Sequence, residues 1–258
     1  PIGMPSQPMA IQLGSVESLL FQSDIGRFGT VFEDPNLFYQ LVSGTLSDDE
    51  IPPATLAGDE LAFLKQVSAT SIQYSTVIRD GALRGKNSLT YPTTNLGKQL
   101  GIVAKLISGG LETPVYLCTI GGFDTHDNQA DATNLQAGTH AGLLKKVSDA
   151  IAAFQDDLQL LGLEQRVVGM TFSEFGRQIE SNASLGTDHG DAAPLFLFGT
   201  CIQSGIIGPN PTIASALPDQ AGIPMQVDFR DVYASLLRDW FQVPSNEVQQ
   251  LFSHQVQF

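Results

Sequence analysis

The chain has 258 residues and is acidic, with 27 aspartates and glutamates against 13 lysines and arginines. Its formal net charge of −14 excludes an extended nucleic-acid-binding surface, because contacts to phosphate groups need clustered basic side chains. No stretch approaches the ~20 apolar residues of a membrane-spanning helix, so we expect no transmembrane segment. The scarcity of lysine and arginine beside many glutamine, asparagine, serine and threonine residues suits an extracytoplasmic location: periplasmic, cell-surface or secreted.

The N-terminal residues 1–56 are expected to form an irregular segment of the same domain as residues 57–258. Residues 11–21, IQLGSVESLLF, predict a short strand or helix. Prolines interrupt residues 34–56, where the acidic run SDDE is typical of a solvated loop or a helix start. The sequence opens at Pro1 in a proline-rich stretch without a signal peptide. We therefore expect the gene product to extend further, with an export signal and at least one more core strand.

Four stretches show the apolar periodicity of helices. The first covers residues 57–83, with acidic residues in its opening turn. The second follows Pro92 and ends at the glycine pair 109–110. The third runs from about 139 to 161, and the fourth covers 228–241. In the second helix the apolar face consists of Leu96, Leu100, Val103 and Ile107.

Three short apolar runs, residues 114–120, 166–172 and 194–199, read as buried strands. Because helices or long connections separate them, we expect one central, mainly parallel sheet with helices on both faces, which is an α/β fold. Such sheets carry their functional loops at the carboxyl ends of the strands. Cys118 and Cys201 lie in or beside apolar runs, which favours two buried thiols over a disulfide.

Polar motifs with candidate metal ligands follow these strands. Asp124 and His126 come after the first strand, and in an extended backbone their side chains share one side. Asp188 and His189 lie between glycines just before the third strand. A carboxylate with imidazoles suits a divalent cation such as zinc. The alternative is that Asp124 caps a turn and His126 lies on the surface, and the spacing alone leaves both readings open.

The motif SEFGR follows the second strand and supplies candidate catalytic residues. Glu174 is a candidate ligand or general base, and Arg177 a candidate donor to an anionic substrate oxygen. The two residues could equally form an ordinary ion pair three residues apart on a helix. Ser173 is a candidate nucleophile without the glycine-flanked turn of serine hydrolases. His140 points either toward the same loops or into solvent.

In order along the chain, five blocks resemble a bacterial family called "domain of unknown function 1501". They are YPTTNLGKQLGIVAKLISGGL, VYLCTIGGFDTHDNQ, MTFSEFGR, SNASLGTDHGDAAPLFLFG and DFRDVYASLLRDWF. The family is grouped with the alkaline phosphatase and sulfatase superfamily, and its members commonly carry export signals. The resemblance implies an alkaline-phosphatase-like α/β domain of three layers around a central, mainly parallel sheet. It also implies that this chain is truncated at its N-terminus.

The superfamily resemblance implies a metal site at the carboxyl ends of the central strands. Asp124 and His126 look like its first Asp and His, and His189 looks like its last His. The chain departs from the pattern at the middle Asp-His pair, because the second strand ends in Ser-Glu-Phe instead. The nucleophile and the first metal carboxylate of the superfamily come from an N-terminal region that is not found here.

Three functions remain open from the sequence. The first is a secreted, metal-dependent hydrolase of phosphate or sulfate esters, acting on small molecules or glycans. In it, Asp124, His126 and His189 hold a zinc-like ion, while Asp188, Glu174 and Arg177 assist. The second is a non-catalytic extracytoplasmic or cell-surface protein with a degenerate metal site. The third is a Ser-His-Asp hydrolase that uses Ser173. A complete active site would require the N-terminal part of the same protein.

Overall fold

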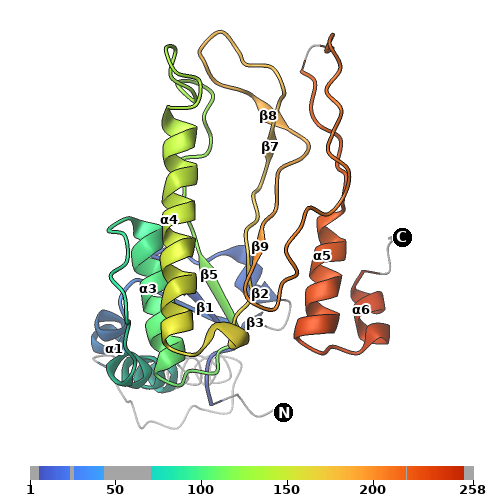
Figure 1. Ribbon diagram of the computed structural model, residues 1–258. Helices are drawn as coiled ribbons and strands as arrows, with labels where there is room; N and C mark the ends of the chain where they lie inside the picture. The colour runs from blue at the N-terminus through green and yellow to red at the C-terminus, as the bar shows by residue number, and fades with distance from the viewer. Residues whose placement is uncertain (1–5, 24–25, 44–70, 219, 253–258) are drawn as a thin grey trace, which may run out of the picture. The chain divides into compact units, whose positions relative to one another are not determined.

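The computed structural model describes residues 6–23, 26–43, 71–218 and 220–252, and its secondary structure is α/β (Figure 1). The chain divides into two compact units. The first unit combines Pro1–Asp124 with Thr139–Val167, and the second combines Thr125–Gly138 with Val168–Phe258. The expected boundary between residues 56 and 57 lies outside the described residues, as does the SDDE run. Each unit is described by itself below.

The first unit is built on a parallel three-stranded sheet in the order β4-β1-β5. The strands are β1 (Ala10–Leu13), β4 (Gly29–Phe32) and β5 (Val115–Cys118). All four residues of the central strand β1 are buried, and Ile11 and Leu13 are 0% exposed. The side-chain amide of Gln12 is buried. It donates to the Val16 carbonyl oxygen and accepts from the Ser18 N–H, so both of its polar atoms have a hydrogen-bond partner.

Short elements connect β1 to β4. They are the 3₁₀ turn η1 (Leu19–Phe21) and the antiparallel pair β2 (Gln22–Ser23) with β3 (Gly26–Arg27). Helix α1 (Pro35–Ser43) then follows β4, although the prolines of this region had indicated irregular chain. The carboxylate of Asp34 accepts the N–H groups of Asn36 and Leu37, and proline is compatible with a first helical turn. Asp-Pro was therefore a helix start.

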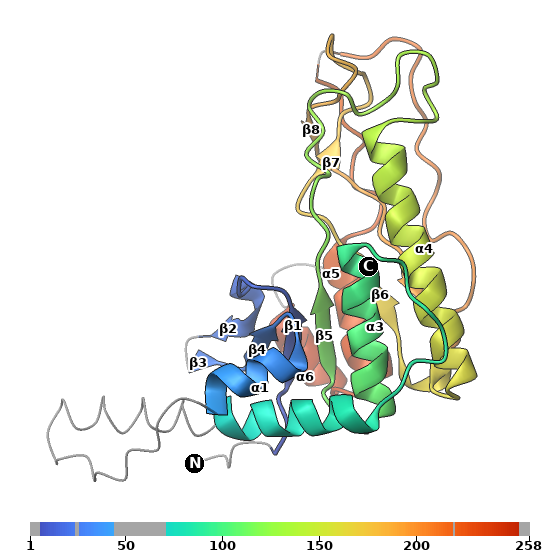
Figure 2. The same ribbon diagram turned by 90° about the vertical axis from the view of Figure 1, so that its left-hand side faces the viewer.

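Helix α3 (Asn95–Ser108) confirms the second helix of the sequence analysis. Its four expected apolar residues are all buried, and the Thr94 hydroxyl caps it by accepting the Gly97 N–H at 3.2 Å. Gly110, at φ +87°, follows its C-terminus. Figure 2 shows α3 alongside β5, which it contacts. Residues 71–84 are also helical, and the preceding part of that expected helix lies outside the described residues.

Helix α4 (Thr139–Leu160) confirms the third helix and packs against α3. Its buried face includes Asp157, which is 0% exposed. The Asp157 carboxylate accepts hydrogen bonds from the Asn87 side-chain amide (3.0 Å), the Ser88 N–H (2.6 Å) and the Tyr91 hydroxyl (3.0 Å). Burial and the neighbouring Asp157 charge raise the pKa of Tyr91, so its hydroxyl remains a donor. The 3₁₀ turn η2 (Glu164–Arg166) follows.

The second unit contains short strands and C-terminal helices. Two-residue strands β6 (Gly169–Met170) and β9 (Leu197–Phe198) pair antiparallel, as do β7 (Gly176–Arg177) and β8 (His189–Gly190). The expected helix at 228–241 starts as α5 (Phe229–Ser235), continues as the π-helical η3 (Leu236–Trp240) and is followed by α6 (Ser245–Leu251). Among the described residues, no helix is both long enough and apolar enough to cross a membrane.

The expectation that three apolar runs share one sheet is wrong. β5 pairs with β1 in the parallel sheet, whereas β6 and β9 form their own antiparallel pair. The first run is also an edge strand, with Val115 41% exposed, instead of a buried central one. Apolar composition does not distinguish a central strand from an edge strand, nor parallel from antiparallel pairing. The central position belongs to β1, whose four residues gave a weaker signal.

Candidate metal centre

The β7–β8 ladder positions His189. Arg177 pairs with His189 and Gly176 with Gly190, and the Gln178 N–H donates to the Asp188 carbonyl oxygen at 3.0 Å. The ladder needs its glycines, because a Cβ on Gly190 would lie 2.5 Å from the carbonyl of Arg177. The sequence around His189 therefore specifies a close approach of two backbones, which fixes where the imidazole leaves the chain.

His126 lies on the segment that follows β5, just after the chain enters the second unit. Asn182 ties this segment to the loop before β8: its side-chain N–H donates to the His126 carbonyl oxygen at 2.8 Å. The side-chain oxygen of Asn182 accepts the N–H groups of Ser184 (2.9 Å) and Gly186 (3.0 Å). A Cβ on Gly186 would collide with the His126 carbonyl. Asn182 and Gly186 thus bring the two loops into contact.

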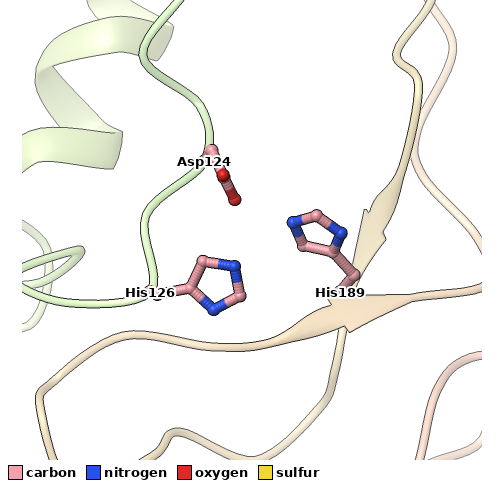
Figure 3. Close-up of side chains that lie close together, drawn as sticks. All are labelled: Asp124, His126 and His189. Atoms are coloured by element: carbon pink, nitrogen blue, oxygen red, sulfur yellow. The ribbon is translucent and has the colours of Figure 1, made fainter.

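Asp124, His126 and His189 form a group that could hold a metal ion (Figure 3). One potential ligand atom from each residue lies within 4.8 Å of the other two. Asp124 directly precedes the second unit and is two residues from His126 along the chain. All three side chains are exposed. The structure therefore brings together three of the four residues that the sequence proposed as metal ligands; that they bind an ion stays a prediction.

Asp188, the fourth proposed ligand, contacts a histidine instead of joining the group. Its carboxylate lies 2.8 Å from Nδ1 of His126. A carboxylate at Nδ1 favours the tautomer that carries a proton there, which leaves Nε2 with a lone pair for a cation. The second imidazole, of His189, is stacked on the ring of Phe175 at 3.9 Å between centroids, and lies 5.0 Å from the His126 ring.

The motif SEFGR contributes mainly to support of the loop. Arg177 donates to the Thr187 carbonyl oxygen at 2.7 Å, and its guanidinium lies 4.9 Å from the centre of the Phe175 ring. Glu174 is exposed and lies outside the group of three. The Ser173 hydroxyl donates its proton to the Phe175 carbonyl oxygen at 2.8 Å, which disfavours Ser173 as a nucleophile activated by an imidazole.

Two further sequence expectations have an outcome in the structure. His140, at the start of α4, makes an edge contact with the ring of Phe123 at 5.7 Å and is not part of the group. Both cysteines are free thiols. The expected burial is wrong for Cys201, which is exposed. Cys118 is partly buried, and burial raises its pKa to about 12.

The sequence analysis missed the residues that hold the site together, namely Asn182, Phe175 and Gln129. The side-chain oxygen of Gln129 accepts hydrogen bonds from the hydroxyls of Thr125 (2.9 Å) and Thr187 (2.8 Å). Thr125 and Gln129 both lie within the GGFDTHDNQ motif, four residues apart, so the sequence did place them beside the candidate ligands. No local pattern connects either residue with the segment 182–187, because that contact exists only in the folded chain.

The donor set fits a divalent cation. Two imidazole nitrogens and one carboxylate oxygen are the ligand types of zinc sites that keep an open position, and of other first-row metals. Atoms bound to one tetrahedral zinc at 2.0–2.2 Å lie about 3.4 Å apart. The three ligand atoms lie within 4.8 Å of one another, so binding one ion requires an approach of at most about 1.4 Å. Side chains that are exposed to solvent can make this movement by rotation.

Comparison with known proteins gives a family for this chain. The model of the family described as "Protein of unknown function (DUF1501)" matches residues 105–252, which include the GGFDTH, SEFGR and GTDHG motifs. No curated protein and no solved structure matches the chain. Since the matched residues make up more than half of the sequence, the chain belongs to the DUF1501 family.

Proposed function

We propose that this chain binds a divalent, zinc-like cation at Asp124, His126 and His189 and belongs to a secreted, metal-dependent hydrolase of phosphate or sulfate esters. The observation that carries the proposal is the convergence of three ligand atoms within 4.8 Å from two motifs more than sixty residues apart in sequence. The resemblance to the alkaline phosphatase and sulfatase superfamily supports the reaction class, the three-layer fold and the export.

The chain's own residues would divide the work as follows. Asp188 holds His126 with Nε2 directed toward a cation, and the Phe175 stack holds His189. A bound ion would polarise the ester and offset charge on the transferring group. Arg177 braces the loop through Thr187, and its role as a donor to a substrate oxygen, with Glu174 as general base, belongs to the same proposal.

The charge of the second unit bears on the substrate. Its basic residues are Arg177, Arg230 and Arg238, and acidic residues outnumber them. Arg230 pairs with Asp228 and Arg238 with Asp239, so both are already engaged. An acidic field repels a doubly charged phosphate monoester more than a singly charged sulfate monoester. The charge of this unit therefore favours the sulfate ester within the proposed class.

A non-catalytic extracytoplasmic protein on the same scaffold is the second candidate. It is favoured by the size of the group, since Asp188 and Glu174 lie outside it and three ligands serve a single ion. A degenerate site predicts no metal binding and no turnover of an ester, whereas the hydrolase predicts both.

Zinc titration by calorimetry tests the proposal. We expect wild-type protein to bind one equivalent of zinc, and His189→Ala and Asp124→Ala to bind it much more weakly. Asp127→Ala is the matched control, because Asp127 is an exposed acid near His126 but outside the group. A wild type without zinc affinity, or an Asp124→Ala variant with unchanged affinity, would refute the metal site. Assays of aryl sulfates and aryl phosphates on the zinc-loaded, full-length protein then test hydrolysis.

A further inference from the structure

Two buried threonines adjoin the candidate ligands. Thr125 lies between Asp124 and His126, and Thr187 directly precedes Asp188. The threonines are 5% and 7% exposed, whereas the acids and His126 beside them are exposed. Neighbouring side chains in extended backbone point to opposite sides. Holding the threonine side chains inside therefore turns the adjacent acids and His126 outward.

A single oxygen atom joins these threonines. Both hydroxyls donate to Oε1 of Gln129, at 2.9 Å and 2.8 Å, and the Thr187 N–H donates to the Thr125 carbonyl oxygen at 3.3 Å. An amide oxygen has two lone pairs, so the two hydroxyls use its full acceptor capacity. Losing this acceptor would remove the hydrogen-bond partner that the two buried hydroxyls share, at a cost in free energy.

We propose that Gln129 is a positioning residue that sets the separation between the His126 and His189 segments. It acts through Thr125 and Thr187 and does not itself contact an ion. Its backbone also bonds to the segment before His189, because the Gln129 N–H donates to the Leu185 carbonyl oxygen at 2.9 Å. The side chain therefore adds a second connection between the two segments, next to the candidate ligands. The inference deepens the proposed function, since its principal readout is affinity for a metal ion.

The test compares three variants by zinc titration. Gln129→Met keeps the length of the side chain and removes the acceptor, while Gln129→Glu keeps an acceptor oxygen. Gln136→Met is the matched control, because Gln136 is an exposed glutamine in the same segment. Residues that orient metal ligands commonly change metal affinity by 10–100-fold, so we expect a roughly tenfold loss in Gln129→Met. Gln129→Glu and Gln136→Met should bind zinc like wild type.

Wild-type zinc affinity in Gln129→Met overturns the proposal. An equal loss of affinity in Gln129→Glu also overturns it, because a positioning role requires that the retained acceptor oxygen restores binding, whereas a general packing role does not. Melting temperatures are measured alongside. If Gln129→Met does not fold, Thr187→Val removes one arm of the bridge, and unchanged zinc affinity there counts equally against it.

If wild-type protein binds no zinc, the proposed function fails while the bridge is still tested. Amide hydrogen exchange at Thr187, measured on metal-free protein, reports the bond to the Thr125 carbonyl. Faster exchange in Gln129→Met but not in Gln129→Glu supports the bridge. Equal exchange in both variants and wild type overturns it.

Discussion

Replacing Asp157 by alanine should strongly destabilise the first unit. The carboxylate is 0% exposed and accepts from Asn87, Ser88 and Tyr91, so its removal leaves three donors facing a cavity. An unsatisfied donor costs about 1–3 kcal/mol when it is fully buried. These three bonds are only partly buried, and Asn87 and Ser88 are exposed residues, so water replaces much of the lost bonding. We therefore expect Asp157→Ala to lower the free energy of unfolding by about 2–3 kcal/mol. Tyr91→Phe removes one donor and should cost about 1 kcal/mol.

Urea unfolding followed by far-UV circular dichroism measures this effect, because the long helices α3 and α4 belong to the first unit. Fluorescence of Trp240, the single tryptophan, reports the second unit separately. Asp156→Ala is the matched control: Asp156 is the exposed neighbour, and its loss should change stability by under about 0.5 kcal/mol. Similar values for Asp156→Ala and Asp157→Ala would refute the reasoning.

Three further outcomes follow from local contacts. Asn182→Ala should weaken zinc binding, because it frees the His126 carbonyl, and a calorimetric affinity equal to wild type would contradict this. Gly186→Ala should also weaken zinc binding, since the added Cβ would collide with the His126 carbonyl oxygen; an unchanged zinc affinity would count against that clash. At pH 8 a thiol reagent should label Cys201 and spare Cys118, whose raised pKa keeps it protonated; mass spectrometry showing Cys118 modified in native protein would contradict this.

Helices were the most predictable part of the fold. In α3 the apolar spacing, the threonine cap and the closing glycines agree, so one reading satisfies them all. Strand pairing was not predictable in the same way, because the four residues of β1 do not indicate that β4 and β5 are its neighbours. The helix start at Asp34-Pro35 was visible in the sequence but was read as a break. Neighbouring residues determine where a helix begins and ends, whereas the pairing of a strand depends on residues far away in the sequence.

The candidate site shows the same division. Glycine-flanked Asp and His motifs indicated Asp124, His126 and His189, and the structure brings these three together. The sequence could not distinguish Asp188 as a partner of His126 from a ligand, because the difference depends on which way one carboxylate turns. All three residues of the group are exposed. Their convergence therefore comes from the loop contacts and not from enclosure in a core.

The interleaving of the two units sets an order in which the molecule can form. All residues of the first unit lie at or before residue 167, including both strands of the distant β1–β5 pair. Residues 125–138, however, belong with 168–258, which supply Asn182, Thr187 and His189. During synthesis the N-terminal unit folds first as a rule. A ribosome-bound chain halted just after residue 167 is therefore expected to have formed the parallel sheet and α4. At that stage His126 would still lack its contacts with Asn182 and Asp188, which follow later in the chain.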